Sequence, residues 1–268
     1  MIIIGEKING SIPSMGKAIA ERNEAHISGL AKRQAEAGSA FIDVCASVDE
    51  ERELETLKWL FGLVEAVVDT PISIDSPSVA VIEKAIPLCK RNGLVNSVSM
   101  EGRKVDTIFP VIADSKWECV CLLSDDTGIP KSASDRLRVF DNLMKKAAMY
   151  KIPPERLHID PLIEMLCTSE DGIAKVTETM REIKRQYPSI HITGGASNIS
   201  FNLPARKFIN RAFIILAMAA GMDSAIIDPL NRDMMGLIYA AEALLGQDEM
   251  CIEYINAFRA GIFGENKF

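Results

Sequence analysis

Short apolar segments alternate with longer amphipathic segments along the whole chain. The short segments are rich in β-branched residues and recur eight times, at residues 2–5, 40–44, 71–75, 94–97, 119–123, 157–160, 190–194 and 224–228. Between them lie stretches with helical periodicity, the clearest at residues 26–38, 78–93, 134–150 and 232–246. Short apolar runs are typical of strands and long periodic runs of helices, so the pattern predicts eight strand–helix units.

The predicted strands are apolar on both faces, which is expected when a parallel sheet is covered on both sides. Eight such units in 268 residues are typical of a (β/α)8 TIM barrel. No Gly/Ser-rich or Pro-rich linker divides the chain, so we expect an α/β protein with one barrel domain over residues 1–268. A doubly wound open sheet is the alternative, although the GxGxxG turn of dinucleotide-binding versions is missing after the first strand.

Composition and charge narrow the class of protein. With 48% hydrophobic and 25% charged residues, the chain can bury a sizeable core. The net charge of −7 argues against nucleic acid and anionic membranes as partners. The longest apolar run, residues 212–222, is far shorter than the ~20 residues that a membrane span needs. Nothing resembles a signal peptide, so we expect a soluble, cytoplasmic protein.

Cysteine and histidine do not form a recognisable metal site in the sequence. The six cysteines and three histidines lack CxxC, HxH and HxxxH spacing, so we expect reduced thiols and no metal. His158 precedes Asp160 by two residues and shares its face of a strand, where a packed histidine is expected rather than a catalytic base. Neither His158 nor His191 ends a strand, which leaves no basis for a Ser–His–Asp arrangement at the strand ends.

Polar residues close nearly every predicted strand. They are Glu6, Asn9, Asp43, Asp75, Asn96, Ser124, Asp160, Asn198 and Asp228. Each alone could be an N-cap of the following helix. In a TIM barrel, however, the carboxyl ends of the strands meet at one mouth, where the active site lies. The repeated position therefore predicts a polar site at that mouth.

Carboxylates and carboxamides together suit a planar heterocycle with several N–H donors and acceptors. One carboxylate can accept two parallel hydrogen bonds from such a ring, and a carboxamide can serve a mixed edge. Paired carboxylates for glycoside hydrolysis remain an alternative. Aromatic residues, however, make up only 6% of the chain and leave little surface for stacking on sugars.

Several segments, in order, resemble one known family. They are MIIIGEKING, PISIDS, LVNS, DTGIPK, LHIDPLI and GASNISFNLPARKFINRAF. These segments are similar to those of the methyltetrahydrofolate:corrinoid methyltransferases. That family consists of pterin-binding barrels related to the folate domain of cobalamin-dependent methionine synthase and, more distantly, to dihydropteroate synthase. The resemblance covers essentially the whole chain.

The resemblance implies roles for individual residues. The residues implied to bind the pterin are Asp75, Asn96, Asp160, Gly195 and Ser197. Asn198 is implied as the catalytic residue whose side chain reaches N5 of the folate, and Arg206 matches an arginine on the corrinoid side. Asp43 is shared with the family, and Glu6, Asn9 and Asp43 are expected to support the pterin contacts. Cys45 departs from the asparagine of some relatives.

The implied reaction moves a methyl group between N5 of tetrahydrofolate and the cobalt of a corrinoid. Asn198 would donate a hydrogen bond where charge develops, without titrating. Departures at Cys45, Phe201 and the Leu-Pro-Ala before Arg206 favour methyl transfer toward tetrahydrofolate. The corrinoid is expected on a separate protein, because the nearest match to its DxHxxG motif, EAHISG at residues 24–29, opens a helix. A homodimer is expected by analogy.

Two other functions are alternatives. Dihydropteroate synthase would require a basic pair where Asn198 and Ile199 stand, and a TPDSF loop where EKINGSIPS stands. A non-catalytic folate-binding protein would keep the pterin contacts, but pterin affinity alone does not require Asn198.

Overall fold

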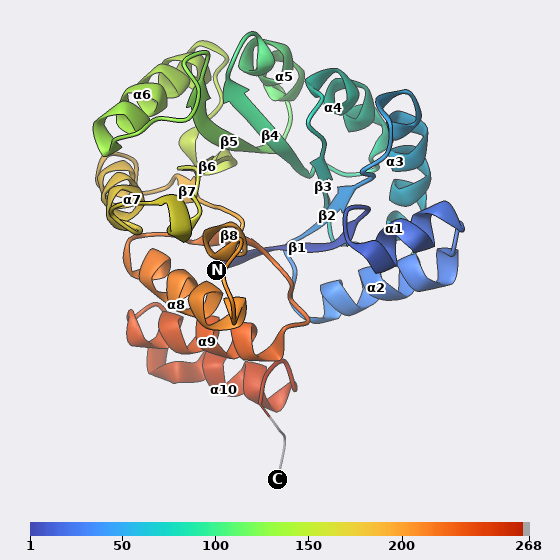
Figure 1. Ribbon diagram of the computed structural model, residues 1–268. Helices are drawn as coiled ribbons and strands as arrows, with labels where there is room; N and C mark the ends of the chain where they lie inside the picture. The colour runs from blue at the N-terminus through green and yellow to red at the C-terminus, as the bar shows by residue number, and fades with distance from the viewer. Residues whose placement is uncertain (265–268) are drawn as a thin grey trace.

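The computed structural model describes residues 1–264, so residues 265–268 of the predicted domain lie outside the described part of the chain. Eight strands form one parallel sheet in the order β7-β6-β5-β4-β3-β2-β1-β8 (Figure 1). They are β1 (Ile2–Asn9), β2 (Phe41–Cys45), β3 (Ile72–Asp75), β4 (Leu94–Met100), β5 (Glu118–Asp125), β6 (Leu157–Asp160), β7 (His191–Ile192) and β8 (Ser224–Ile227).

The sheet closes into a barrel between its two outermost strands. Gly195 bridges to Ile226 in parallel, and the Ile226 N–H donates to the Gly194 carbonyl at 3.2 Å. The (β/α)8 prediction is therefore confirmed, and the open doubly wound sheet is excluded. No helix among residues 1–264 is long and apolar enough to cross a membrane.

The helices surround the barrel (Figure 1). They are α1 (Pro13–Ala20), α2 (Glu24–Glu36), α3 (Glu50–Glu65), α4 (Val79–Ala85), α5 (Lys104–Ile112), α6 (Ala133–Met149), α7 (Ala174–Gln186), α8 (Arg206–Ala219), α9 (Arg232–Leu244) and α10 (Ile252–Arg259). Several begin where the sequence supplies a capping oxygen: Asn23 accepts the His26 N–H before α2, and Ser132 accepts the Asp135 N–H before α6.

Two predicted elements are shorter than expected. The helix predicted over residues 78–93 ends at Ala85 and tightens into a 3-10 turn, Ile86–Leu88, because Pro87 cannot donate the next backbone hydrogen bond. The strand predicted over residues 190–194 contains only His191 and Ile192. Gly194 and Gly195 follow and leave the extended ladder for the turn at the barrel mouth.

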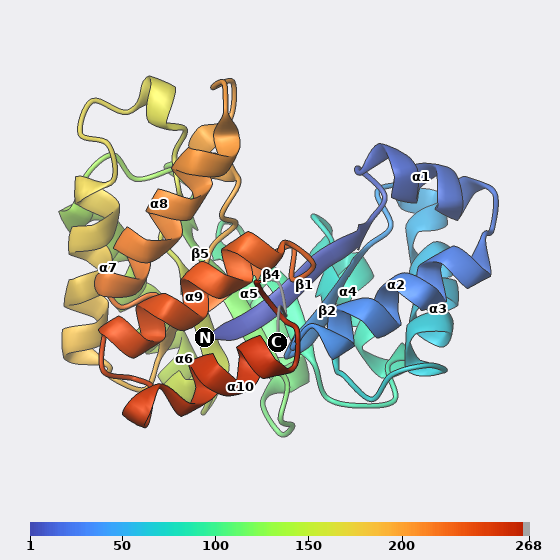
Figure 2. The ribbon, with the colours of Figure 1, turned by 90° about the horizontal axis from the view of Figure 1, so that it is seen from below.

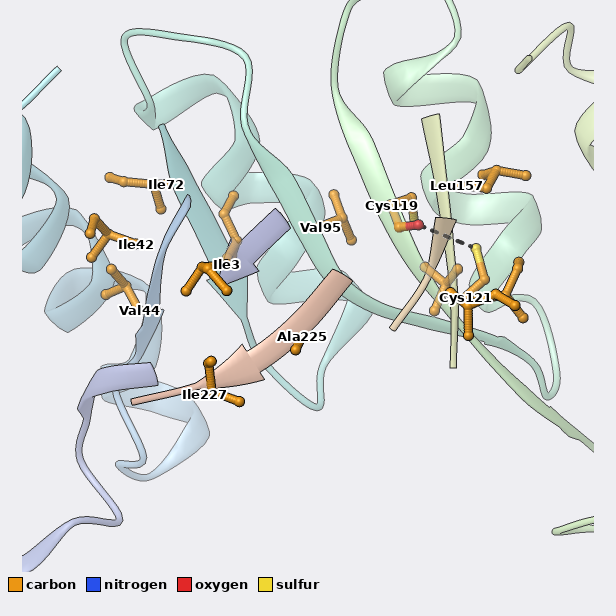
Figure 3. Packing of buried hydrophobic residues seen from close by; sticks show 14 of the residues in the cluster. Ile3, Ile42, Val44, Ile72, Val95, Cys119, Cys121, Leu157, Ala225 and Ile227 are labelled. Carbon is orange, nitrogen blue, oxygen red and sulfur yellow. Dashed lines mark hydrogen bonds between the residues drawn. The ribbon is translucent and has the colours of Figure 1, made fainter. Parts of the chain in front are cut away.

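Alternate residues of each strand face opposite sides of the barrel wall. One set, which includes Ile42, Val44, Val95 and Ile227, packs outward against the helices (Figure 3). The other set faces the barrel interior, where a separate apolar layer is formed by Ile4, Phe41, Leu94 and Val120. This layer is a floor beneath the polar strand ends, so those side chains lie above an apolar layer rather than in open water.

Candidate active site

The strand alternation directs the polar strand-end residues into the barrel. Counting by twos from the apolar layer leads from Ile4 to Glu6, from Phe41 to Asp43, from Leu94 to Asn96 and from Val120 to Leu122. The register then aligns Asp43 with Ser73, Asp75 with Asn96, and Leu122 with Asp160. Residues from β1, β2, β3, β4 and β6 therefore form one polar layer at the carboxyl ends of the strands.

Asp43 lies at the centre of the hydrogen bonds in this polar layer. Its carboxyl is 2% exposed, and its Oδ1 accepts hydrogen bonds from Ser73 Oγ at 2.5 Å and from Asn96 Nδ2 at 3.2 Å. Because Asn96 Nδ2 donates one hydrogen downward to Asp43, its Oδ1 is left to accept from a ligand. Sequence reasoning did not identify Ser73, whose signal was its place two residues before Asp75 on the same strand face.

The pKa values of these carboxyls are raised. Burial and the nearby charge of Asp75 raise the pKa of Asp43 well above its usual range, against the hydrogen bonds from Ser73 and Asn96. Burial also raises the pKa of Asp75, against a hydrogen bond from the Cys45 thiol. Several acids thus share a site that disfavours multiple negative charges, and a bound ligand with N–H donors would relieve that cost.

Asp160 is the last residue of β6 and belongs to the same polar layer. It is 8% exposed, and its Oδ1 accepts the Leu162 backbone N–H at 2.7 Å, so Oδ2 remains to accept from a ligand. Burial raises the pKa of Asp160 to about 6, against that backbone hydrogen bond. A Cβ added at Gly194 would stand 2.5 Å from Ile163 Cδ1 and 3.6 Å from Asp160 Oδ1, so Gly194 packs directly on this part of the site.

Asn198 is the exposed first residue of a short turn that follows β7, and Ile199 and Ser200 of the same turn are buried. A Cβ at Gly195 would stand 3.4 Å from Asn198 Nδ2, which places the amide over the backbone at the exit of β7. The Asn198 side chain is therefore exposed at the exit of β7 and is not turned into the protein interior. Arg206, the first residue of α8, donates from Nη2 to the Ser197 carbonyl at 2.7 Å and from Nε to Ser200 Oγ at 3.0 Å.

Of the predicted supporting residues of β1, Glu6 lies near Asp228 after β8, and Asn9 lies beside the connection after β2. Burial, followed by the charge of Asp228, raises the pKa of Glu6 to about 7, and Lys7, which lowers it, pairs with Asp228 at 3.1 Å. Asn9 Oδ1 accepts from the Ser11 N–H and hydroxyl, and from Ser47 Oγ at 3.2 Å. Asn9 therefore ties the connections after β1 and β2 together.

The opposite end of the barrel holds a polar network that sequence reasoning missed. The buried His158 ring contacts Glu118 Oε2 at 2.7 Å through Nε2 and Ser224 Oγ at 2.9 Å through Nδ1. Burial lowers the pKa of His158, so the neutral ring donates to the carboxylate and accepts from the serine. Ser224 is fully buried, so this carboxylate–imidazole–hydroxyl chain cannot reach a substrate. The expectation of a packed histidine at position 158 is confirmed.

The mouth therefore combines buried and half-buried carboxyl and carboxamide acceptors with an exposed carboxamide donor. Figure 2 shows the connections before and after β7 rising on one side of the molecule, and α1 on the other. Within residues 1–264, no three His, Cys, Asp or Glu side chains are grouped so that they could hold a metal ion. Chemically, the arrangement can hold a flat, N–H-rich ring and donate a hydrogen bond to an atom at its edge.

Comparison with known sequences gives a family and a full-length relative. The sequence model described as "Pterin binding enzyme" matches residues 13–228. The "Methylcorrinoid:tetrahydrofolate methyltransferase" of Eubacterium limosum is 47% identical over 266 residues, 98% of this chain and 98% of that protein. The "Methionine synthase" of Mycobacterium leprae is 28% identical over 253 residues, which are 87% of this chain and 21% of that protein.

Solved structures give the same fold. A dihydropteroate synthase from Clostridium difficile, solved in the presence of pteroic acid, has a TM-score of 0.70 at 20% identity and covers 91% of this chain and 96% of that chain. A Yersinia pestis dihydropteroate synthase has a TM-score of 0.66 at 16% identity and covers 91% and 94%. At such low identity the likeness shows the fold alone.

Proposed function

The chain belongs to the pterin-binding enzyme family, and on that premise we propose that it is a methyltransferase acting between N5 of tetrahydrofolate and the cobalt of a corrinoid. The name of the Eubacterium limosum relative states this activity, and the likeness to that protein runs over nearly the whole of both chains. The single structural observation that carries the proposal is the exposed Asn198 amide at the same barrel mouth as the half-buried acceptors Asp75 and Asn96 and the buried acceptor Asp160.

The pterin ring is proposed to lie on the polar layer. Asp75 and Asp160 would accept from the N–H donors of the ring, and the free Oδ1 of Asn96 would accept from a further N–H. Gly195 and Ser197 would let the backbone approach the ring after β7. Support comes from the partly or fully buried position of all three acceptors and from the single oxygen that Asp160 leaves free.

Asn198 is proposed as the catalytic residue. In the direction of folate methylation, N5 attacks the methyl carbon, the N–C bond forms, and the cobalt–carbon bond breaks with its electron pair left on cobalt, which becomes Co(I). N5 then loses its proton to solvent. The Asn198 side chain would orient the N5 lone pair and, in reverse, donate to N5 as it leaves. A preorganised donor of this kind is worth about 2–4 kcal/mol of barrier.

The net direction is proposed to be from methylcorrinoid to tetrahydrofolate. The name of the Eubacterium limosum relative gives methylcorrinoid as donor and tetrahydrofolate as acceptor. The corrinoid is proposed to arrive on a separate protein. The nearest match to a corrinoid-binding motif, EAHISG, forms the first turns of α2, a helix that packs against the barrel.

A second copy of the chain is proposed to cover the outer face of α8. Phe208, Ile215 and Leu216 lie on one face of this helix and are 62%, 36% and 53% exposed. Next to it, α9 and α10 border a groove lined by Leu237, Ala240, Tyr254 and Phe263. A two-fold axis could place each copy's α8 stripe against the other's groove, as a self-complementary interface requires. Sedimentation of wild type and Leu216→Glu tests this pairing.

A cytoplasmic location is also proposed. All six cysteines are unpaired, and Cys167 and Cys251 are exposed. Free surface thiols are typical of reducing compartments.

Methyl transfer from free methylcob(III)alamin to tetrahydrofolate tests the proposed reaction directly. The protein is mixed with both compounds, the cobalamin spectrum is followed, and methyltetrahydrofolate is quantified. We expect formation of Co(I) and methyltetrahydrofolate in equal amounts. Calorimetry with tetrahydrofolate runs in parallel. Binding without turnover would mean that the protein is a folate binder and not this enzyme.

A further inference from the structure

One side chain holds both ends of the turn that carries Asn198. The turn is a short 3-10 segment, Asn198–Ser200, with Ser197 before it. Arg206 Nη2 donates to the carbonyl of Ser197 at 2.7 Å, and Arg206 Nε donates to Ser200 Oγ at 3.0 Å. The Ser200 hydroxyl in turn donates to the Ser197 carbonyl at 3.3 Å, so the three residues form a closed set of hydrogen bonds.

The turn is anchored by the buried Ile199 and Ser200, whereas Asn198 itself is exposed. The preceding strand, β7, ends at Ile192, and the chain from there to α8 is irregular, with Asn202 and Ala205 at positive φ of 62° and 51°. The backbone hydrogen bond of Asn198 itself is long, at 3.4 Å from its N–H to Gly195 O, whereas Phe201 N–H to Asn198 O and Leu203 N–H to Ser200 O are 3.2 Å and 3.1 Å. An exposed carboxamide on such a segment would otherwise sample many positions.

The position of Arg206 in its helix also requires an explanation. It is the first residue of α8, whose first turn contains no acidic residue and receives no side-chain cap. The amino end of a helix carries partial positive charge, so a cation there is unfavourable unless it has another role. The hydrogen bonds to the turn supply that role. Its guanidinium also lies 5.4 Å from the Phe201 ring centroid, on the same turn.

We propose that Arg206 is a positioning residue that fixes the Asn198 turn, so that the amide is already placed when N5 and the methyl group meet. This inference rests on the proposed methyl transfer, and it assigns Arg206 a role different from the corrinoid-side contact that the family resemblance implies. A planar guanidinium can donate to a carbonyl and a hydroxyl at once in fixed geometry, whereas a lysine offers one flexible point charge.

The first test compares Arg206→Ala and Arg206→Lys with Lys207→Ala, in methyl transfer from free methylcob(III)alamin to tetrahydrofolate. Lys207 is a matched control, because it is the next cation in α8 and lies over the Phe208 ring at 5.1 Å. Both Arg206 variants should lose about tenfold to a hundredfold in kcat, since misplacing a catalytic group by about 1 Å costs this much. Tetrahydrofolate affinity should stay within about threefold, and Lys207→Ala should match wild type.

A double-mutant cycle separates positioning from docking. If Arg206 acts through Asn198, adding Arg206→Ala to Asn198→Ala should cost no further activity. Full additivity would overturn the proposal. So would a loss of activity that appears with a methylated corrinoid protein and disappears with free methylcob(III)alamin, because that pattern identifies a contact with the partner.

Amide hydrogen exchange provides a readout that does not depend on turnover. Arg206→Ala should speed exchange in residues 198–203 and leave the strands and the thermal midpoint of unfolding unchanged. Unchanged exchange in that turn would contradict the proposal even if wild type proves inactive. An inactive wild type with faster exchange in the variant would instead reject the methyl-transfer function and retain the clamp.

Discussion

Asn96 donates its side-chain N–H to Oδ1 of Asp43 at 3.2 Å, which joins the carboxamide on β4 to a buried acid on β2. Burial and the charge of Asp75 raise the pKa of Asp43 well above its usual range, which favours the neutral form of this carboxyl. Asp43 Oδ1 accepts hydrogen bonds from both Asn96 and Ser73, and the Asn96 contact fixes the orientation of that carboxamide.

Replacement of Asp43 tests whether this residue supports the site as a neutral acceptor or as a charged carboxylate. An asparagine at this position keeps the accepting oxygen and is neutral, so Asp43→Asn should bind tetrahydrofolate within about threefold of wild type. Asp43→Ala removes the acceptor and should weaken binding by about tenfold or more. Calorimetric titration measures both. Equal damage from the two substitutions would mean that Asp43 works as a carboxylate.

Asp75 and Asp160 are expected to contact the ligand directly. Asp75→Asn or Asp160→Asn replaces one accepting oxygen with a donor that faces the N–H groups of the pterin. Each should weaken tetrahydrofolate binding by roughly tenfold to a hundredfold, the worth of a hydrogen bond to a charged group. Asp141→Asn on the exposed face of α6 is the control. Wild-type affinity in either site variant would remove that residue from the pterin contacts.

The unliganded protein is expected to become more stable as the pH falls from 8 to 5. Burial raises the pKa of Glu6 to about 7 and that of Asp160 to about 6. As the pH falls, these two groups therefore take up protons in the folded state before they do so in the unfolded chain. Folding is therefore favoured by protonation in this window, by on the order of 2 kcal/mol. Urea unfolding across the window measures the effect, and Glu6→Gln should flatten its upper part. Stability that falls steadily below pH 7 would contradict this assignment.

The His158 network should support the fold but not the chemistry. Ser224→Ala removes the hydroxyl that pairs with His158 Nδ1 and leaves a buried ring nitrogen unsatisfied, which should cost about 1–3 kcal/mol of unfolding free energy. Because the network lies at the amino ends of β5, β6 and β8, kcat should be unchanged below the melting temperature. Loss of kcat at full folding would show that this network acts on the mouth.

The polar residues of the mouth could be predicted because strand alternation is a local property. Once a strand is placed, its period of two decides that Asp43, Asp75, Asn96 and Asp160 face the same interior as the apolar layer. Their meeting at one end follows from parallel strands. The contacts within the layer, such as that between Ser73 and Asp43, require only the register between neighbouring strands.

Other features depend on contacts that no local pattern encodes. The hydrogen bonds that link Glu118, His158 and Ser224 join three strands that are far apart in the sequence. Each of these residues lies near the start of its strand, where no local pattern indicates a partner. The contacts of Arg206 arise from an irregular segment whose path is set by Asn202 and Ala205 in left-handed conformations. The predicted β7 is longer than the observed strand, because apolar content does not indicate that the continuous strand ends before Gly194 and Gly195.

Methyl transfer by Asn198→Ala, measured in a single turnover beside calorimetric affinity for tetrahydrofolate, is the most direct test of the proposed mechanism. Loss of the donor should slow the methyl-transfer step by about a hundredfold to a thousandfold, the usual cost of removing one preorganised donor. Tetrahydrofolate affinity should remain within about tenfold of wild type. A variant that binds folate and transfers the methyl group at the wild-type rate would contradict the assignment of Asn198 as the catalytic residue.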